Sequence, residues 1–154
     1  MKRKAERGLT LVELIVAFTI LALLTSMSVP LARYRVRRDQ ERELRYALRE
    51  IRKSIDDYKD ASLSGKIDVK LGTEGYPETL EQLVEGVKLL QNAEGKKIKF
   101  LRRIPKDPMT GTFEWGKRSM QDDPKSQSWG GQNIFDVYTK STGRARDGTA
   151  YSEW

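Results

Sequence analysis

The chain of 154 residues contains no cysteine and no histidine, and these two absences exclude several kinds of chemistry. Without cysteine there can be no disulfide bond and no thiol nucleophile. Without either residue, zinc sites of the usual ligand types and Ser-His triads are excluded as well. Because the remaining residues form no recognisable catalytic constellation, we expect that the protein is not an enzyme.

Acidic residues are outnumbered by basic ones, and the formal net charge is +7. A basic surface is the electrostatic footprint of nucleic-acid binding, but no motif here interleaves aromatic residues with the basic ones. Charged runs of this kind are typical of a solvated surface. We therefore predict no nucleic-acid partner.

Long apolar runs are scarce too, and the longest one, residues 9–32, contains a single charge, Glu13. It follows a basic leader, residues 1–8, and is long enough for a membrane span, which needs about 20 residues. A carboxylate inside hydrocarbon costs about 2.5–3.5 kcal/mol, so such residues are usually paired or functional. A secretory signal has a shorter apolar segment and a small-residue cleavage site. A plain membrane anchor stays open, although it gives Glu13 no role.

The sequence Gly8-Leu-Thr-Leu-Val-Glu-Leu resembles the class III signal of type IV pilins and type II secretion pseudopilins. The resemblance implies that a prepilin peptidase cuts between Gly8 and Leu9 and methylates the new amino group of Leu9. Glu13 then becomes the fifth mature residue, whose carboxylate pairs with the amine of a neighbouring copy during assembly. The family usually has phenylalanine at the first mature position, where this chain has leucine.

Three segments are expected: a cleaved leader (1–8), a transmembrane and assembly helix (9–32), and a soluble periplasmic domain (33–154) that includes the second half of the long helix. Basic residues flank the apolar run on both sides, so the positive-inside rule does not decide its orientation. The resemblance implies a single pass through the inner membrane, with the leader in the cytoplasm and the domain in the periplasm.

The apolar run continues directly into a charged amphipathic helix. Apolar residues spaced by three or four form one stripe of this second half, namely Leu44, Leu48, Ile51, Ile55 and Tyr58. Pro30 interrupts the pattern because proline removes a helical hydrogen bond and crowds the preceding turn. Either a mild kink or a segment that unwinds on assembly is consistent with a proline there.

Downstream of the long helix, expected to end near Ala61, the pattern changes to loops and short elements. A loop at residues 62–75 is expected to hold a short strand near 67–71. The segment YPETLEQLVEG predicts a short helix that begins at Thr79 or in the preceding turn and ends at Gly86. Its buried apolar face is expected to consist of Leu80, Leu83 and Val84. Strands are expected at 112–115 and 134–139, joined by a long hairpin loop. The fold class is therefore α+β, with a small antiparallel sheet covering one stripe of the long helix, as in type IV pilins.

The resemblance extends beyond the N-terminus. The segments YPETLEQLVEG, RRIPKDPMTGTFEW and FDVYT, followed by DGTAYSEW, are similar to those of major pseudopilins. The lack of cysteine favours the same group, since many type IVa pilins close their C-terminal loop with a disulfide. The implied function is a structural subunit that polymerises into a periplasmic pseudopilus for protein export. The implied partners are further copies, minor pseudopilins, the inner-membrane assembly platform, prepilin peptidase and the membrane.

Major pseudopilins commonly bind calcium in the C-terminal loop, through aspartates and main-chain carbonyls. Asp147 matches one ligand position, but the family's second aspartate falls on Ala150. Asp147 together with Glu153 or Asp136 would supply too few ligands, because calcium favours six to eight oxygen ligands. We therefore expect no cofactor, with calcium at Asp147 as the alternative.

Without calcium, Asp147-Gly148 is interpreted as a tight turn, and Tyr151 and Trp154 are expected to hold the loop by packing. Two other functions stay open from the residues alone. A type IV pilin for adhesion, motility or DNA uptake would share the same helix and signal. A membrane-anchored binding domain would need a ligand-binding constellation, and none is recognisable.

Overall fold

A computed structural model describes residues 10–90 and 95–154, with the backbone but not the side chains of residues 27–32. Gly8 and Leu9, the predicted cleavage and methylation positions, lie outside the described residues. The chain divides into two compact units, Met1–Asp39 and Gln40–Trp154. The architecture is α+β, with a long N-terminal helix and small antiparallel sheets, as in type IV pilin-like folds.

Helix α1 runs from Leu11 to Leu63, two residues past the predicted end. It continues through position 30, and this is compatible with both alternatives stated for Pro30, a mild kink and a segment that unwinds on assembly. Proline deletes one hydrogen bond of the ladder, and the remaining turns keep the segment helical. The helix ends in a Schellman motif: the Lys66 N–H donates to Ala61 O, and the N–H of Gly65, which has φ 64°, donates to Ser62 O.

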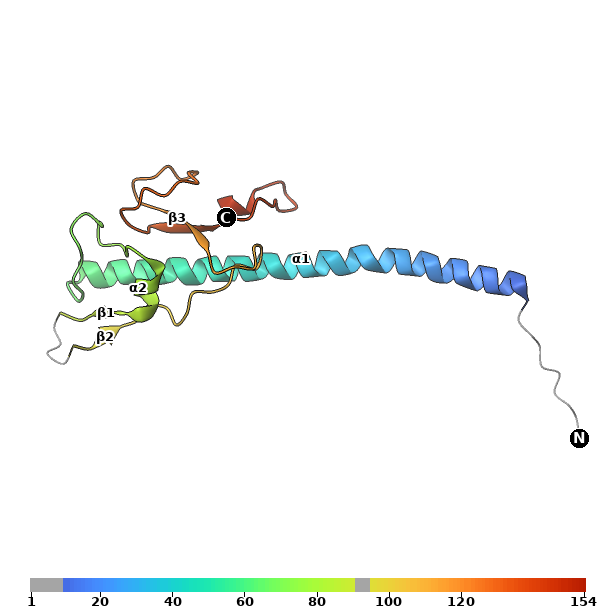
Figure 1. Ribbon diagram of the computed structural model, residues 1–154, viewed down its shortest axis with the longest axis horizontal. Helices are drawn as coiled ribbons and strands as arrows, with labels where there is room; N and C mark the ends of the chain where they lie inside the picture. Colours follow the sequence, from blue (N-terminus) through green and yellow to red (C-terminus); the bar gives the residue numbers. More distant parts are fainter. Residues whose placement is uncertain (1–9, 91–94) are drawn as a thin grey trace, which may run out of the picture. The chain divides into compact units, whose positions relative to one another are not determined.

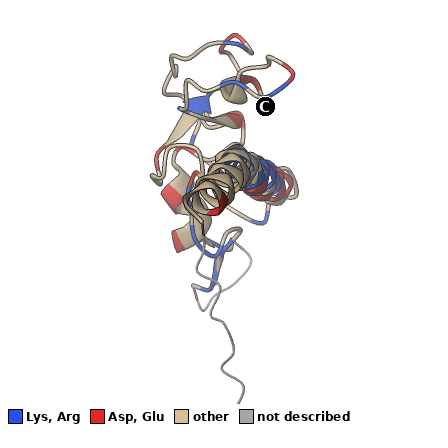
Figure 2. Ribbon diagram, turned by 90° about the vertical axis from the view of Figure 1, so that its right-hand side faces the viewer, with Lys and Arg blue, Asp and Glu red and all other residues tan. Residues whose placement is uncertain are grey.

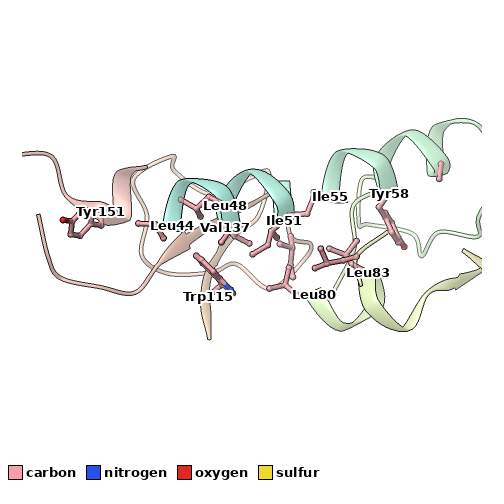
Figure 3. Close-up of a cluster of buried hydrophobic side chains, with 14 of the residues drawn as sticks. Leu44, Leu48, Ile51, Ile55, Tyr58, Leu80, Leu83, Trp115, Val137 and Tyr151 are labelled. Atoms are coloured by element: carbon pink, nitrogen blue, oxygen red, sulfur yellow. The ribbon is translucent and has the colours of Figure 1, made fainter. Parts of the chain in front are cut away.

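In the second unit, the predicted apolar stripe of α1 forms the centre of the core. All five side chains are buried, at 0–4% exposure. Figure 3 shows them facing side chains from the rest of this unit, namely Leu80, Leu83, Trp115, Val137 and Tyr151. Each such side chain contributes about 1.5–3 kcal/mol when it is fully buried, so this stripe is what holds the domain on its helix.

Helix α2, Leu80–Glu85, confirms the predicted short helix and both of its ends. The Thr79 hydroxyl caps it by accepting from the Gln82 N–H, and Leu80 and Leu83 are buried. Gly86 follows with φ 84°, and a Cβ there would lie 2.7 Å from Ile98 O. Glycine is therefore required at this stop for both its backbone angle and its close approach.

Two antiparallel pairs of strands are present among the described residues. Strand β1, Val87–Lys88, pairs with β2, Lys97–Ile98, and β3, Trp115–Arg118, pairs with β4, Asp136–Thr139. Within the second unit, β3 and the C-terminal segment lie on one side of α1, whereas α2, β1 and β2 lie on the other (Figures 1 and 2). The helix is thus covered from two sides by small sheets rather than by one sheet.

The strand predictions were right in kind and partly wrong in position. The strand expected at 112–115 starts only at Trp115, because residues 107–112 form a turn held by the Asp107 carboxylate. The strand expected near 67–71 is reduced to an isolated bridge between Ile67 and Leu89. The strand expected at 134–139 is confirmed at 136–139. The β1–β2 hairpin was not predicted, since two-residue strands leave no alternating pattern to detect.

The connection from β3 to β4 is ordered by its own polar groups. Asp122 Oδ2 accepts from the Ser119 N–H at 2.7 Å and from the Gly130 N–H at 3.0 Å. These two backbone donors hold the pKa of Asp122 below its usual value of 3.8. The Trp129 indole donates to Asn133 O at 2.8 Å. The predicted long hairpin loop is therefore held in one conformation by its own hydrogen bonds.

Candidate functional site

Glu13 lies in the first turn of α1, next to a helix cap that the sequence analysis overlooked. The Glu13 N–H donates to the Thr10 hydroxyl at 3.3 Å, so Thr10 caps the helix. Thr10-x-x-Glu13 is the spacing of a capping box, in which Glu or Gln stands three residues after the cap. A carboxylate here also lies favourably at the positive end of the helix dipole. The Ser/Thr-x-x-Glu pattern before an apolar run was the signal that could have revealed this cap.

The apolar half of α1 exposes its side chains throughout residues 10–26. Large apolar residues such as Leu11 and Phe18 are 74% and 76% exposed. Hydroxyl groups on this segment donate back to main-chain carbonyls of the same helix at 2.7–2.8 Å, from Thr19, Thr25 and Ser26. Figure 2 shows this half almost free of charge, whereas the other half carries both signs. An exposed apolar surface of this extent marks a site of association, and its hydroxyls need no outside partner.

Within the described part of the chain, no helix has a stretch long and apolar enough to span a membrane.

Asp107 is a buried carboxylate to which the sequence analysis assigned no role. It is 0% exposed. Its Oδ1 accepts from the Met109 N–H at 2.8 Å, and its Oδ2 accepts from the hydroxyls of Thr110 at 3.0 Å and Thr139 at 2.5 Å. The last bond ties the turn to β4. The carboxylate therefore fixes the 107–112 turn against the sheet.

Asp147 forms the tight turn that was the alternative to a metal site. Its Oδ1 accepts from the Thr149 N–H at 3.0 Å and the Thr149 hydroxyl at 2.6 Å, and Gly148 has φ 90°. These bonds, with a smaller contribution from Arg45, hold the pKa of Asp147 below its usual value of 3.8. The turn is closed by the Ala145 N–H donating to Thr149 O at 2.7 Å.

Tyr151 and Trp154 hold the C-terminal segment by packing, as predicted. Tyr151 is 3% exposed, and its hydroxyl donates to Glu41 Oε1 of α1 at 2.7 Å. The Trp154 ring meets it edge-on at 5.0 Å between centroids. The Arg45 guanidinium stacks on the Trp154 ring, at 3.7 Å from its centroid. Aromatic and cation–π contacts thus join the segment to the helix.

The residues around Asp147 do not fit a calcium site. The groove that it lines, of about 570 Å³, is also lined by Arg45, Arg49 and Arg52, which oppose a cation. Asp136, a candidate second ligand, accepts from two arginines instead. In the described residues, no group of three acidic side chains is placed to hold a metal.

The family profile for the prokaryotic N-terminal methylation motif matches residues 3–29. The chain carries a prepilin-type signal. The matched segment includes the predicted cut after Gly8 and the predicted assembly residue Glu13. No curated protein and no solved structure matches the chain significantly. Together with the α+β fold on a long N-terminal helix, the motif supports a type IV pilin-like protein, a structural class that is processed by prepilin peptidase and polymerises.

Proposed function

We propose that this chain is a structural subunit of a type II secretion pseudopilus. Residues 1–8 are a leader that prepilin peptidase removes, and Leu9 becomes the methylated N-terminus. Residues 9–32 anchor the subunit in the inner membrane in a single pass and stack it against other copies. Residues 33–154 lie in the periplasm. The observation that carries assembly into a filament is the methylation motif at residues 3–29 on a helix with an exposed apolar half.

Assembly proceeds through that exposed half. Helix α1 exposes every side chain over residues 11–26, and most of them are apolar. Neighbouring copies and lipid chains cover this surface, so its apolar area is packed against other helices or hydrocarbon and not exposed to water. Glu13 then pairs with the methylated amine of Leu9 in the next copy. A mispaired register leaves both charges buried alone, which costs about 3–5 kcal/mol, so the pair selects one register. Pro30 is a point at which α1 unwinds locally as subunits pack.

The export role, rather than a pilus role, is supported by the C-terminal segment. It lacks a disulfide loop and is held by Tyr151, Trp154 and the Asp147 turn. In this role, the filament pushes folded proteins through an outer-membrane channel, with minor pseudopilins and the inner-membrane platform as partners. A type IV pilin for adhesion, motility or DNA uptake is the second candidate, and the shared signal favours neither.

Electron microscopy after co-expression of the full chain with a prepilin peptidase tests the proposal. We expect helical fibres at the cell surface or in sheared fractions. The matched control is the same chain without the peptidase, which should yield no fibres. Dispersed membrane-bound monomers in both samples would contradict assembly and favour a simple anchored domain.

A further inference from the structure

The C-terminal segment meets the sheet at a cluster of oxygen atoms that two arginines bind. Arg52, on α1, donates through Nε to Asp136 Oδ1 at 2.7 Å and through Nη2 to the main-chain oxygens of Val137 and Trp154 at 3.1 and 2.8 Å. One guanidinium therefore joins the helix, β4 and the end of the C-terminal segment. The fork geometry of arginine suits this set of acceptors.

Arg118, on β3, binds the same carboxylate from the other side. Its Nη1 donates to Asp136 Oδ2 at 3.3 Å, its Nη2 to Ser152 O at 3.2 Å, and its Nε to Ser126 O at 2.8 Å. Arg118 is only 6% exposed, and its guanidinium lies 4.1 Å from the centroid of the Tyr138 ring. It thus connects the β3–β4 loop, β4 and the C-terminal segment.

Taken together, the two guanidinium groups bind six oxygen atoms, namely both carboxylate oxygens of Asp136 and the main-chain oxygens of Ser126, Val137, Ser152 and Trp154. One carboxylate with main-chain oxygens is the kind of set that calcium binds in proteins. Here both oxygens of that carboxylate already face cations. The two guanidinium groups that contact this carboxylate repel a divalent cation.

We infer that Arg52 and Arg118 replace a calcium ion in closing the C-terminal segment and the β3–β4 loop, so that this closure is independent of calcium. The arginines supply the positive charge and the directed donors that fix the backbone oxygens. Closure then depends on guanidinium geometry rather than on the concentration of a metal. The inference concerns the fold of the domain and stands whether or not the chain assembles into filaments.

Thermal unfolding of the full chain in detergent, with calcium or with a chelator, tests this inference. A calcium concentration of about 10 mM lies well above the dissociation constants of weak extracellular calcium sites. We expect the same Tm for the wild type in both conditions. Arg118→Lys keeps the charge but loses the fork, and we expect it to lower Tm by about 5–10 °C, with calcium giving no recovery. Amide hydrogen exchange should speed up in residues 119–131 and 143–154.

Arg49→Lys is the matched control. Arg49 lies on the same helix and lines the same groove, but its Nε donates to Arg45 O of its own helix. Its Tm should fall by less than about 2 °C. Arg52→Lys repeats the test at a half-exposed position if Arg118→Lys does not fold. A calcium-dependent rise of more than about 5 °C in the wild type, or lysine variants that behave like the control, would overturn the inference.

Discussion

Glu13→Gln is expected to abolish fibre formation while the domain folds as in the wild type. The substituted side chain keeps the capping-box geometry, since glutamine serves at that position as well as glutamate. It loses the negative charge that the proposed pair with the Leu9 amine requires. An amine left buried without its partner costs about 3–5 kcal/mol, which is at least a hundredfold in subunit affinity. Electron microscopy and quantification of sheared fibres measure the effect.

Thr10→Ala is the matched control for this substitution. It removes the hydroxyl that caps α1 but leaves the Glu13 carboxylate in place. Loss of a cap costs about 1 kcal/mol of helix stability, at a helix end that lipid and neighbours also hold. Fibres should therefore still form. If Glu13→Gln forms fibres like the wild type while Thr10→Ala does not, assembly depends on the Thr10 cap and not on the charge of Glu13.

Asp107→Ala is expected to destabilise the domain by about 2–4 kcal/mol, because three buried or half-buried donors lose their acceptor. These are the Met109 N–H and the hydroxyls of Thr110 and Thr139. The turn at 107–112 also loses its tie to β4. For a domain of this size we expect a fall in Tm of roughly 10 °C, measured by circular dichroism of the full chain in detergent.

Asp107→Asn should recover more than half of that loss, since the amide oxygen still accepts from the Met109 N–H and the amide NH₂ can donate to the threonine hydroxyls. Asp123→Ala is the exposed control: Asp123 Oδ1 accepts from the Lys125 N–H in the β3–β4 loop, and its removal should shift stability by less than about 1 kcal/mol. An Asp107→Ala variant as stable as the Asp123 control would show that the buried carboxylate is not what fixes the turn.

The elements that the sequence predicted well are those with strong local signals. The stripe from Leu44 to Tyr58 follows helical spacing along α1, and every member is buried. Helix α2 has a capping threonine and a stopping glycine, and both act at the predicted positions. Signals of this kind lie within a few neighbouring residues, so they can be recognised without knowing which distant residues are in contact.

The positions of the strands depend on distant contacts, and there the prediction was off. Strand β3 starts at Trp115 because the Asp107 carboxylate holds the preceding turn and Thr139 of β4 holds Asp107. Gly116 and Arg118 were assigned to a loop because glycine and arginine carry little strand preference. In the fold, the Tyr138 ring covers Gly116, and a Cβ there would lie 2.3 Å from that ring. A cross-strand contact of this kind leaves no local mark in the sequence.

The candidate functional residues also fall into those with a local signal and those that only the fold brings together. The signal at Gly8–Glu13 is contiguous, so the sequence revealed it and the family profile matches it. The closure of the C-terminal segment joins Arg52, Arg118 and Asp136, which are up to 84 residues apart in the chain. No spacing rule connects them. The sequence could therefore raise the question of calcium at Asp147, but only the fold brings the two arginines to the carboxylate.

Intact mass spectrometry of the mature protein, purified from cells that express a prepilin peptidase, tests the central claim most directly. The account predicts a chain that begins at Leu9 and is heavier than unmodified residues 9–154 by one CH₂ unit, because a methyl group replaces one hydrogen. A retained leader, or an N-terminus at any residue other than Leu9, would leave Glu13 without its partner amine and would contradict assembly through that pair.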